Sequence, residues 1–299
     1  MLRCMLDPDG DVVRYLKRTG AGRIHEGWAC YHTELLADKG DVKSMAVLGV
    51  LHIIGTPGIQ NDLAKGQKLI LAAAAWGDIE GPRVAGRGFI SGWMGSIDPG
   101  RAAKYFRFAA DHGDAQAALY LADLYFTGRG VAKDDLEGDR LAEKSASQGY
   151  REAQALIGLR GLQAYAEGVS EDPSEALKWL DRAAQQGDPI ALRALANYYL
   201  NLAAKSGKLD IPRGIDLLKR CVEGSGDADC AMSYAGFLDS GLAHRDLKEI
   251  YKMYLRANRS GRNDRAQRRL AELSKDLSTQ DLLQIQLDLA KYPLQMSQR

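Results

Sequence analysis

Residues 115–149 read AQAALYLADLYFTGRGVAKDDLEGDRLAEKSASQG, and this stretch decides the fold. In its first part, residues 115–127, apolar side chains recur every three or four positions, which predicts an amphipathic helix. Gly128 and Gly130 then end that helix, because glycine adopts the left-handed backbone conformation that closes a helix without steric strain.

A second helix is predicted over residues 136–148. Its apolar residues keep the same spacing, Asp134 or Asp135 is its candidate N-cap, and Gly149 stops it. Two helices as short as these cannot bury their apolar faces alone. They need neighbours of the same kind on both sides, so the stretch predicts one unit of a stacked repeat.

The same plan recurs along the chain with a period of 35 to 39 residues. Each copy closes with a glycine, which aspartate follows in most copies, and small residues, usually two alanines, stand three and four positions before it in four copies. Small side chains at a fixed position let neighbouring helix axes approach closely. The closing glycines are Gly40, Gly77, Gly113, Gly149, Gly187, Gly226 and Gly261.

The string from Leu121 to Val131, followed by Asp134, resembles the Sel-1-like repeat. That pattern runs L-G-x-x-Y-x-x-G-x-G-V-x-x-D, then K-A, an aromatic residue, A-A and a final G; residues 172–187 match its second half. The resemblance implies an all-α fold, a right-handed α/α superhelical solenoid of about six to seven helix-pair repeats, related to the tetratricopeptide fold.

The resemblance covers roughly residues 41–261, where it implies six repeats. Residues 1–40 are expected to form a degenerate capping repeat and residues 262–299 a pair of capping helices, all in one continuous solenoid. Two departures weaken the pattern late in the chain: residues 209–213 lack the Gly-x-Gly loop, and Val222-Glu223 replaces Ala-Ala.

Charge and hydropathy exclude several classes of function. The net charge of +1 gives no electrostatic case for binding nucleic acid or an acidic membrane surface. There is no run of about twenty apolar residues, so no transmembrane helix is expected. The N-terminal stretch, residues 1–11, is too short and too acidic to be a secretory signal. We therefore expect a cytoplasmic protein, or a periplasmic one if an N-terminal signal has been removed.

The four cysteines are Cys4, Cys30, Cys221 and Cys230. Some secreted members of the family pair two cysteines within each repeat, and that regular pattern is absent. Cys221 and Cys230 fall in successive helices, so packing could bring them together. The sequence leaves a disulfide open but favours reduced thiols in the core.

The sequence offers no constellation for catalysis, a cofactor or a metal. None of the five histidines stands at metal-ligand spacing, and His52, at the tyrosine position of the repeat, is expected in the core. The glycines around Arg87 follow no predicted strand, which argues against a phosphate loop. The arginines between Arg256 and Arg269 are expected to form a solvated end helix rather than a patch for an acidic partner. We therefore expect no enzyme.

By similarity to the tetratricopeptide fold, the first helix of each repeat should line the concave side of the solenoid. The resemblance implies a polar groove of mixed charge there, more basic early and more acidic late. The predicted partner-binding residues are Arg83, Arg87, Gln116, Asp123, Glu152, Gln163, Arg193, Asn197, Asn201, Asp229 and Asp239.

The predicted function is a non-enzymatic protein–protein interaction module, a scaffold or adaptor that grips another protein in this groove. The alternative that the resemblance implies is an immunity protein that binds and neutralises a secreted bacterial toxin, such as a phospholipase-type effector. Some members of the family have been linked to cell-wall or β-lactam chemistry, but no nucleophile or metal set supports an enzyme. The sequence does not separate the first two functions.

Overall fold

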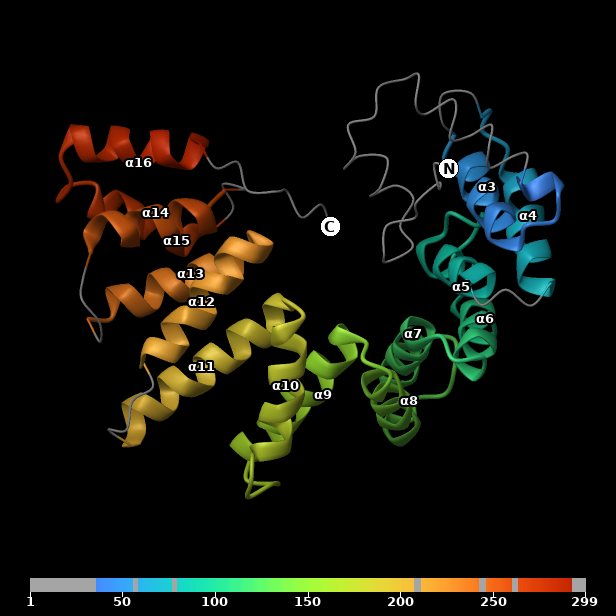
Figure 1. The fold of residues 1–299 in the computed structure, drawn as a ribbon, viewed down its shortest axis with the longest axis horizontal. Coiled ribbons are helices and arrows are strands. Elements are labelled where there is room, and N and C mark those ends of the chain that lie inside the picture. The colour runs from blue at the N-terminus through green and yellow to red at the C-terminus, as the bar shows by residue number, and fades with distance from the viewer. Residues whose placement is uncertain are drawn as a thin grey trace. The chain divides into compact units, whose positions relative to one another are not determined.

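The computed structural model describes residues 36–55, 59–76, 80–206, 211–241, 246–259 and 263–291. Within these ranges the regular elements are helices joined by loops, with no β-strand (Figure 1), so the predicted all-α class is confirmed. Most of the predicted N-terminal capping repeat, with Cys4 and Cys30, lies outside them. The helices are α3 (Val42–Ile54), α4 (Leu63–Ala75), α5 (Glu80–Ser91), α6 (Pro99–Asp111), α7 (Ala115–Thr127), α8 (Asp135–Ser147), α9 (Arg151–Ala166), α10 (Ser174–Gln185), α11 (Pro189–Ser206), α12 (Ile211–Ser225), α13 (Ala228–Asp239), α14 (Leu247–Ala257), α15 (Asp264–Leu273) and α16 (Thr279–Lys291).

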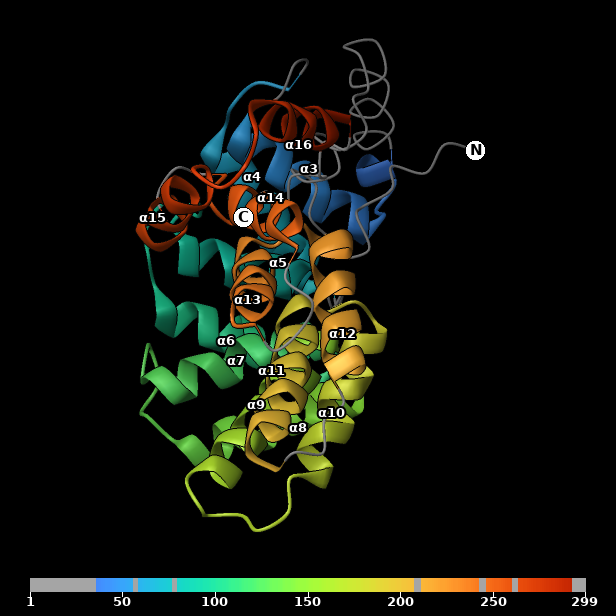
Figure 2. The same ribbon diagram turned by 90° about the vertical axis from the view of Figure 1, so that its left-hand side faces the viewer.

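The chain divides after Tyr150 into two compact units, which we call unit one and unit two. In unit one, α3 packs on α4, α5 on α6 and α7 on α8, and each pair contacts the next. Unit two repeats this with the pairs α9/α10, α11/α12 and α13/α14, followed by α15 and α16, which both contact α14 (Figure 2). Helices stacked pairwise in this way make an α-solenoid.

The repeated Gly-Asp pair joins one repeat to the next. Gly187 takes the left-handed conformation, with φ of +78°, and reverses the chain after α10. Asp188 then caps α11, since its carboxylate accepts a hydrogen bond from the Ala191 N–H at 2.8 Å. The caps of α3, α7 and α13 follow the same plan with Asp41, Asp114 and Asp227.

Small residues let the helices approach as the sequence predicts. Ala183 and Ala184 are 0% and 3% exposed in the core of unit two. In unit one, a Cβ added to Gly86 would lie 2.5 Å from the ring of Phe106, so glycine is required where α5 meets α6. Gly86 is thus a packing residue inside a helix, in agreement with the argument against a phosphate loop. The buried core between the helices consists mainly of alanine and larger aliphatic side chains.

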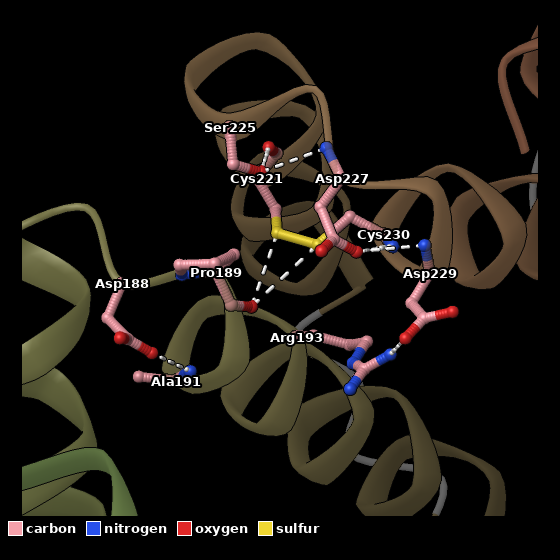
Figure 3. The surroundings of a disulfide bond; sticks show 9 residues. All are labelled: Asp188, Pro189, Ala191, Arg193, Cys221, Ser225, Asp227, Asp229 and Cys230. Atoms are coloured by element: carbon pink, nitrogen blue, oxygen red, sulfur yellow. Dashed lines mark hydrogen bonds and ion pairs between the residues drawn. A yellow bond between two sulfur atoms is a disulfide. The ribbon is translucent and has the colours of Figure 1, made fainter. Parts of the chain in front are cut away.

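The cysteines correct a prediction. Cys221 in the last turns of α12 and Cys230 in the first turn of α13 form a disulfide, where the sequence favoured reduced thiols (Figure 3). The turn at Gly226 reverses the chain and brings the two helix ends together. The Cα atoms are 5.9 Å apart, inside the usual range for a disulfide. The bond differs from the pairing within one repeat that some family members have, because it joins the second helix of one repeat to the first helix of the next.

Candidate functional site

The predicted groove residues lie on the first helices of their repeats, as expected. Ten of them have described side chains, while that of Asn201 in α11 lies outside the description. Their surroundings nevertheless differ sharply. Arg83 and Arg87 lie on α5, Gln116 and Asp123 on α7, Glu152 and Gln163 on α9, Arg193, Asn197 and Asn201 on α11, and Asp229 and Asp239 on α13.

Arg83 belongs to the interior of unit one. Its side chain is buried, its Nε donates to Asp114 Oδ2 at 2.9 Å, and its Nη1 donates to Gln116 Oε1 at 2.6 Å. Gln116 in turn donates to the hydroxyl of Tyr120. Arg83 and Gln116 therefore hold α5 against α7 and offer no free charge to a partner.

Asp239 is also occupied within the fold. Its carboxylate receives two hydrogen bonds from Arg269 of α15, at 2.5 and 2.8 Å, and one from the Tyr254 hydroxyl of α14 at 3.4 Å. These hydrogen bonds, with a further one to Glu272, raise the pKa of Arg269. Asp239 therefore ties three helices together, and Arg269, from the predicted basic cluster, is neutralised by this role.

Arg193 and Asp229 meet each other at the surface of unit two. The Nη1 atom of Arg193 lies 2.9 Å from Asp229 Oδ2, and the two side chains are 31% and 62% exposed (Figure 3). Asn197 is exposed one turn further along α11. We call these three residues the α11/α13 face; in it, accessible polar groups from two consecutive first helices meet.

Arg83 and Arg193 occupy the same position of the repeat and both pair with the next first helix, but they differ in burial. Arg83 and Arg193 each stand six positions after a closing glycine, and Gln116 and Asp229 stand three positions after the next one. The same two positions thus link consecutive first helices in both units. In unit one the link is buried, whereas in unit two it is solvent-accessible.

The disulfide fixes the backbone beneath this face. Both sulfur atoms contact the carbonyl oxygen of Pro189 in α11, at 3.3 and 3.7 Å (Figure 3). The Asp227 carboxylate accepts hydrogen bonds from the backbone N–H groups of Asp229 and Cys230. Asp229 therefore lies between an N-cap and a covalent link, so its backbone is held in a fixed position. Such preorganisation lowers the entropy lost on binding.

Glu152 and Asp188 form an acidic neighbourhood between α9 and α11. Burial raises the pKa of the Asp188 carboxyl; the hydrogen bond from Ala191 opposes this, the nearby Glu152 adds to it and Arg151 opposes it. Glu152 pairs with Arg151 at 3.0 Å, and its Oε2 atom is buried without a hydrogen-bond partner among the described groups. The arrangement is that of a buried helix cap with a flanking ion pair.

The remaining predicted residues stand apart from this face. Arg87 is half-buried and Asp123 is exposed, both in unit one. Gln163 is exposed on α9 and donates to Glu167, in the turn that follows this helix, at 2.8 Å. The groove prediction thus combined residues that the structure uses in different ways.

The described residues also bear on other kinds of site. Within them, no three side chains of His, Cys, Asp or Glu are grouped so that they could hold a metal ion. Across the same residues, no helix combines the length and apolar character that spanning a bilayer requires. His52 is buried in the core, as expected; its Nδ1 atom lies 3.2 Å from the Gln60 carbonyl oxygen, and its Nε2 atom has no hydrogen-bond partner among the described groups.

The stacked helix pairs and their polar first-helix faces define the class of this protein, an α-solenoid repeat protein. The Sel1 repeat model matches residues 42–78, 87–114, 115–150 and 151–188. The chain therefore belongs to the Sel1-repeat family, which is related to the tetratricopeptide repeats. The later helix pairs, which carry the departures noted in the sequence, keep the paired packing without matching that model.

Two solved structures resemble the chain closely in fold. A protective antigen of uropathogenic Escherichia coli with an SLR (Sel1-like repeat) fold has a TM-score of 0.72 at 23% identity over 91% of this chain; the chain spans 61% of that antigen's length. A Sel1 repeat protein from Oxalobacter formigenes has a TM-score of 0.65 at 22% identity, over 82% of this chain and 94% of its own. At these identities the likeness shows the fold alone.

A more distant likeness concerns the alternative function. An immunity protein from Pseudomonas aeruginosa aligns with 53% of this chain and 57% of its own at 24% identity, with a TM-score of only 0.39. A likeness this weak carries no argument about function. No curated protein matches the sequence.

Proposed function

We propose that this Sel1-repeat protein is a non-enzymatic module that binds a partner protein through the first-helix surface, with the α11/α13 face at its centre. The observation that carries the proposal is the accessible ion pair between Arg193 and Asp229, beside the exposed Asn197. Arginine makes paired hydrogen bonds to carboxylates and is enriched where proteins meet. At the equivalent positions in unit one, Arg83 is buried and bonded to Gln116 in the helix packing, so this pair is unsuited to the role.

The structure supplies a rigid base for such a face. Helix caps at both Asp188 and Asp227, and the disulfide next to Asp229, hold the relevant turns of α11 and α13. A partner that pairs with Arg193 would compete with Asp229, whose carboxylate is more than half exposed and can turn away. The exchange keeps the guanidinium paired in both states.

The test starts with affinity capture on the immobilised chain and identification of captured proteins by mass spectrometry. The same capture with Arg193→Ala/Asn197→Ala should lose the partner. A matched control is Arg140→Ala/Glu143→Ala, because Arg140 forms a similar exposed ion pair, with Glu137, on the second helix α8. Equal capture by both variants would contradict the proposed face.

The immunity function is a narrower form of this proposal and uses the same face. It requires that the captured partner be a toxin whose activity falls to zero at one equivalent of this protein. If the captured partner has no toxic activity, the immunity function is rejected and the scaffold or adaptor function is supported.

The disulfide bears on where such binding takes place. Disulfides persist in oxidising compartments and are rare in reducing ones. The Cys221–Cys230 bond therefore supports a periplasmic or extracellular setting over the cytoplasmic one expected from the sequence. A fusion to a reporter that is active only outside the cytoplasm tests this, when it is made to the protein expressed from its own gene.

A further inference from the structure

Helices α9 and α11 of unit two are longer than the other first helices, and each carries a tyrosine near the loop that follows α9: Tyr165 in the last turn of α9 and Tyr198 in the middle of α11. Helices α9 and α11 have 16 and 18 residues, whereas α7 and α13 have 13 and 12. Tyr165 lies in the last turn of α9 and is 37% exposed. Tyr198 lies on the neighbouring α11 and is half-buried. In Figures 1 and 2 the α9–α10 loop lies at the same end of unit two as the last turns of α11.

The loop after α9 holds an apolar side chain in solvent. Val169 is 78% exposed, although its backbone is well fixed. The backbone N–H groups of Val169 and Ser170 both donate to the Ala164 carbonyl, at 2.8 and 3.2 Å, while Gly168 takes a φ of +74°. This closed turn is a stable helix end, so the exposure of Val169 is built into the loop rather than produced by fraying.

The same loop is acidic. Between Glu167 and Glu175 the chain carries four carboxylates and no lysine or arginine. The next basic residue, Lys178, is engaged by Glu175 at 2.6 Å. Burial is the main cause that raises the pKa of the Tyr198 hydroxyl. The nearby Tyr165 and Asp172 raise it further, so both lie close to Tyr198. Two tyrosines, an exposed valine and a set of carboxylates therefore share one edge of unit two.

We propose that this edge, formed by Tyr165, Val169, Glu171, Asp172 and Tyr198, docks a basic segment of the partner protein. Lysine and arginine side chains bind the faces of tyrosine rings and pair with carboxylates. An exposed and a half-buried tyrosine beside an exposed apolar residue match the composition of an interface centre. The negative charge of the loop excludes an acidic segment. The inference rests on the proposed function and specifies the chemistry of the partner.

The test uses three labelled peptides of equal length that share the same Leu, Gly and Ser residues and differ in carrying four Lys, four Gln or four Glu. Fluorescence anisotropy with the full chain should show the Lys peptide binding at least about tenfold more tightly than the other two, a difference of about 1.4 kcal/mol. The affinity should fall as salt rises, because exposed charges are screened.

The variant Tyr165→Ser/Val169→Ser should lower the affinity for the Lys peptide by at least about fivefold. Glu171→Lys should also lower this affinity, although it removes no apolar contact. The matched control is Leu136→Ser, an 83% exposed apolar residue on α8, which should bind the peptide like the parent. Unchanged melting temperatures check the fold. Equal binding of the Lys and Glu peptides, or full binding by Tyr165→Ser/Val169→Ser, would overturn the inference.

The captured partner separates this inference from the proposed function. A partner lost by Arg193→Ala/Asn197→Ala and retained by Tyr165→Ser/Val169→Ser would leave the proposed function standing and reject the acidic edge. A partner lost by the edge variant and retained by the other would support the edge and move the binding surface away from the α11/α13 face.

Discussion

Arg83 on α5 donates a 2.9 Å hydrogen bond to Asp114, which is itself the N-cap of α7. Both side chains are about nine-tenths buried. The Asp114 carboxylate therefore caps the N-terminus of α7 and also binds Arg83 of the preceding repeat. The contact shows how this chain converts a local capping residue into a link between repeats.

Replacing Arg83 by alanine should destabilise unit one strongly. The change leaves Asp114 and Gln116 without their buried partner, at a cost of about 3 kcal/mol. Urea unfolding followed by circular dichroism measures it. Arg140→Ala, which removes an exposed ion pair on α8, is the control and should cost less than about 1 kcal/mol. Similar losses in the two variants would show that the burial of Arg83 has no energetic consequence.

The helix stacking of unit two should not tolerate a larger side chain at Ala184. This residue is 3% exposed and lies in a core that includes Leu180 and Leu195. We expect Ala184→Leu to overpack the contact and to cost about 1–3 kcal/mol. An unfolding midpoint and slope equal to those of the parent would mean that the position is open after all.

These two residues also show how far the sequence predicts the structure. Ala184 could be placed in the core because its distance from a closing glycine repeats along the chain. Arg83 could not, because the pattern marks it as a polar residue of a first helix and does not say which way it turns. Its burial depends on Asp114, 31 residues later, and such a contact follows only from the distance between packed helices.

The sequence leaves the Cys221–Cys230 disulfide open, and favours reduced thiols, for a related reason. The sequence places the two cysteines in successive helices, but pairing depends on the angle at which the turn at Gly226 returns the chain. The sequence presents the Gly-Asp pairs as markers of the repeat, whereas the role of aspartate as the cap of the following helix appears only in the structure. The edge formed by Tyr165, Val169 and Tyr198 is not predicted from the sequence either, although the 38- and 39-residue repeats that contain α9 and α11 are visible in it.

Removing the disulfide should lower the stability of unit two. For a closed loop of about ten residues, the loss of the cross-link costs about 2–3 kcal/mol, through the entropy of the unfolded chain. The melting temperature of the parent should therefore fall on addition of dithiothreitol, while that of Cys221→Ala/Cys230→Ala should not respond. A parent that is insensitive to the reductant, and whose unreduced digest shows no linked peptide, would contradict the bond.

Asp188 gives a pH dependence of definite sign. Its pKa is raised above the ordinary value of 3.8 by burial, so between the unfolded and folded pKa values the folded state binds more protons. Stability must therefore fall as pH rises through that window. Asp188→Asn keeps the capping oxygen and removes the buried charge.

The Asn variant should thus match or exceed the parent in stability at pH 7 and lose this advantage at low pH. Asp188→Ala removes the cap as well and should cost about 1 kcal/mol at either pH. Denaturant unfolding at several pH values provides the measurement. A parent that is more stable than Asp188→Asn at pH 7, by as much as it exceeds Asp188→Ala, would show that the charge itself stabilises the cap.

The central claim is that a partner protein binds at the α11/α13 face, and the most direct test is calorimetric titration of the captured partner. Arg193→Ala/Asn197→Ala should weaken binding by at least about tenfold, or about 1.4 kcal/mol, with the melting temperature nearly unchanged, because truncating central polar anchors costs affinity while exposed positions contribute little stability. Arg140→Ala/Glu143→Ala should bind like the parent. A double variant that binds the partner with the parent's affinity would contradict the account.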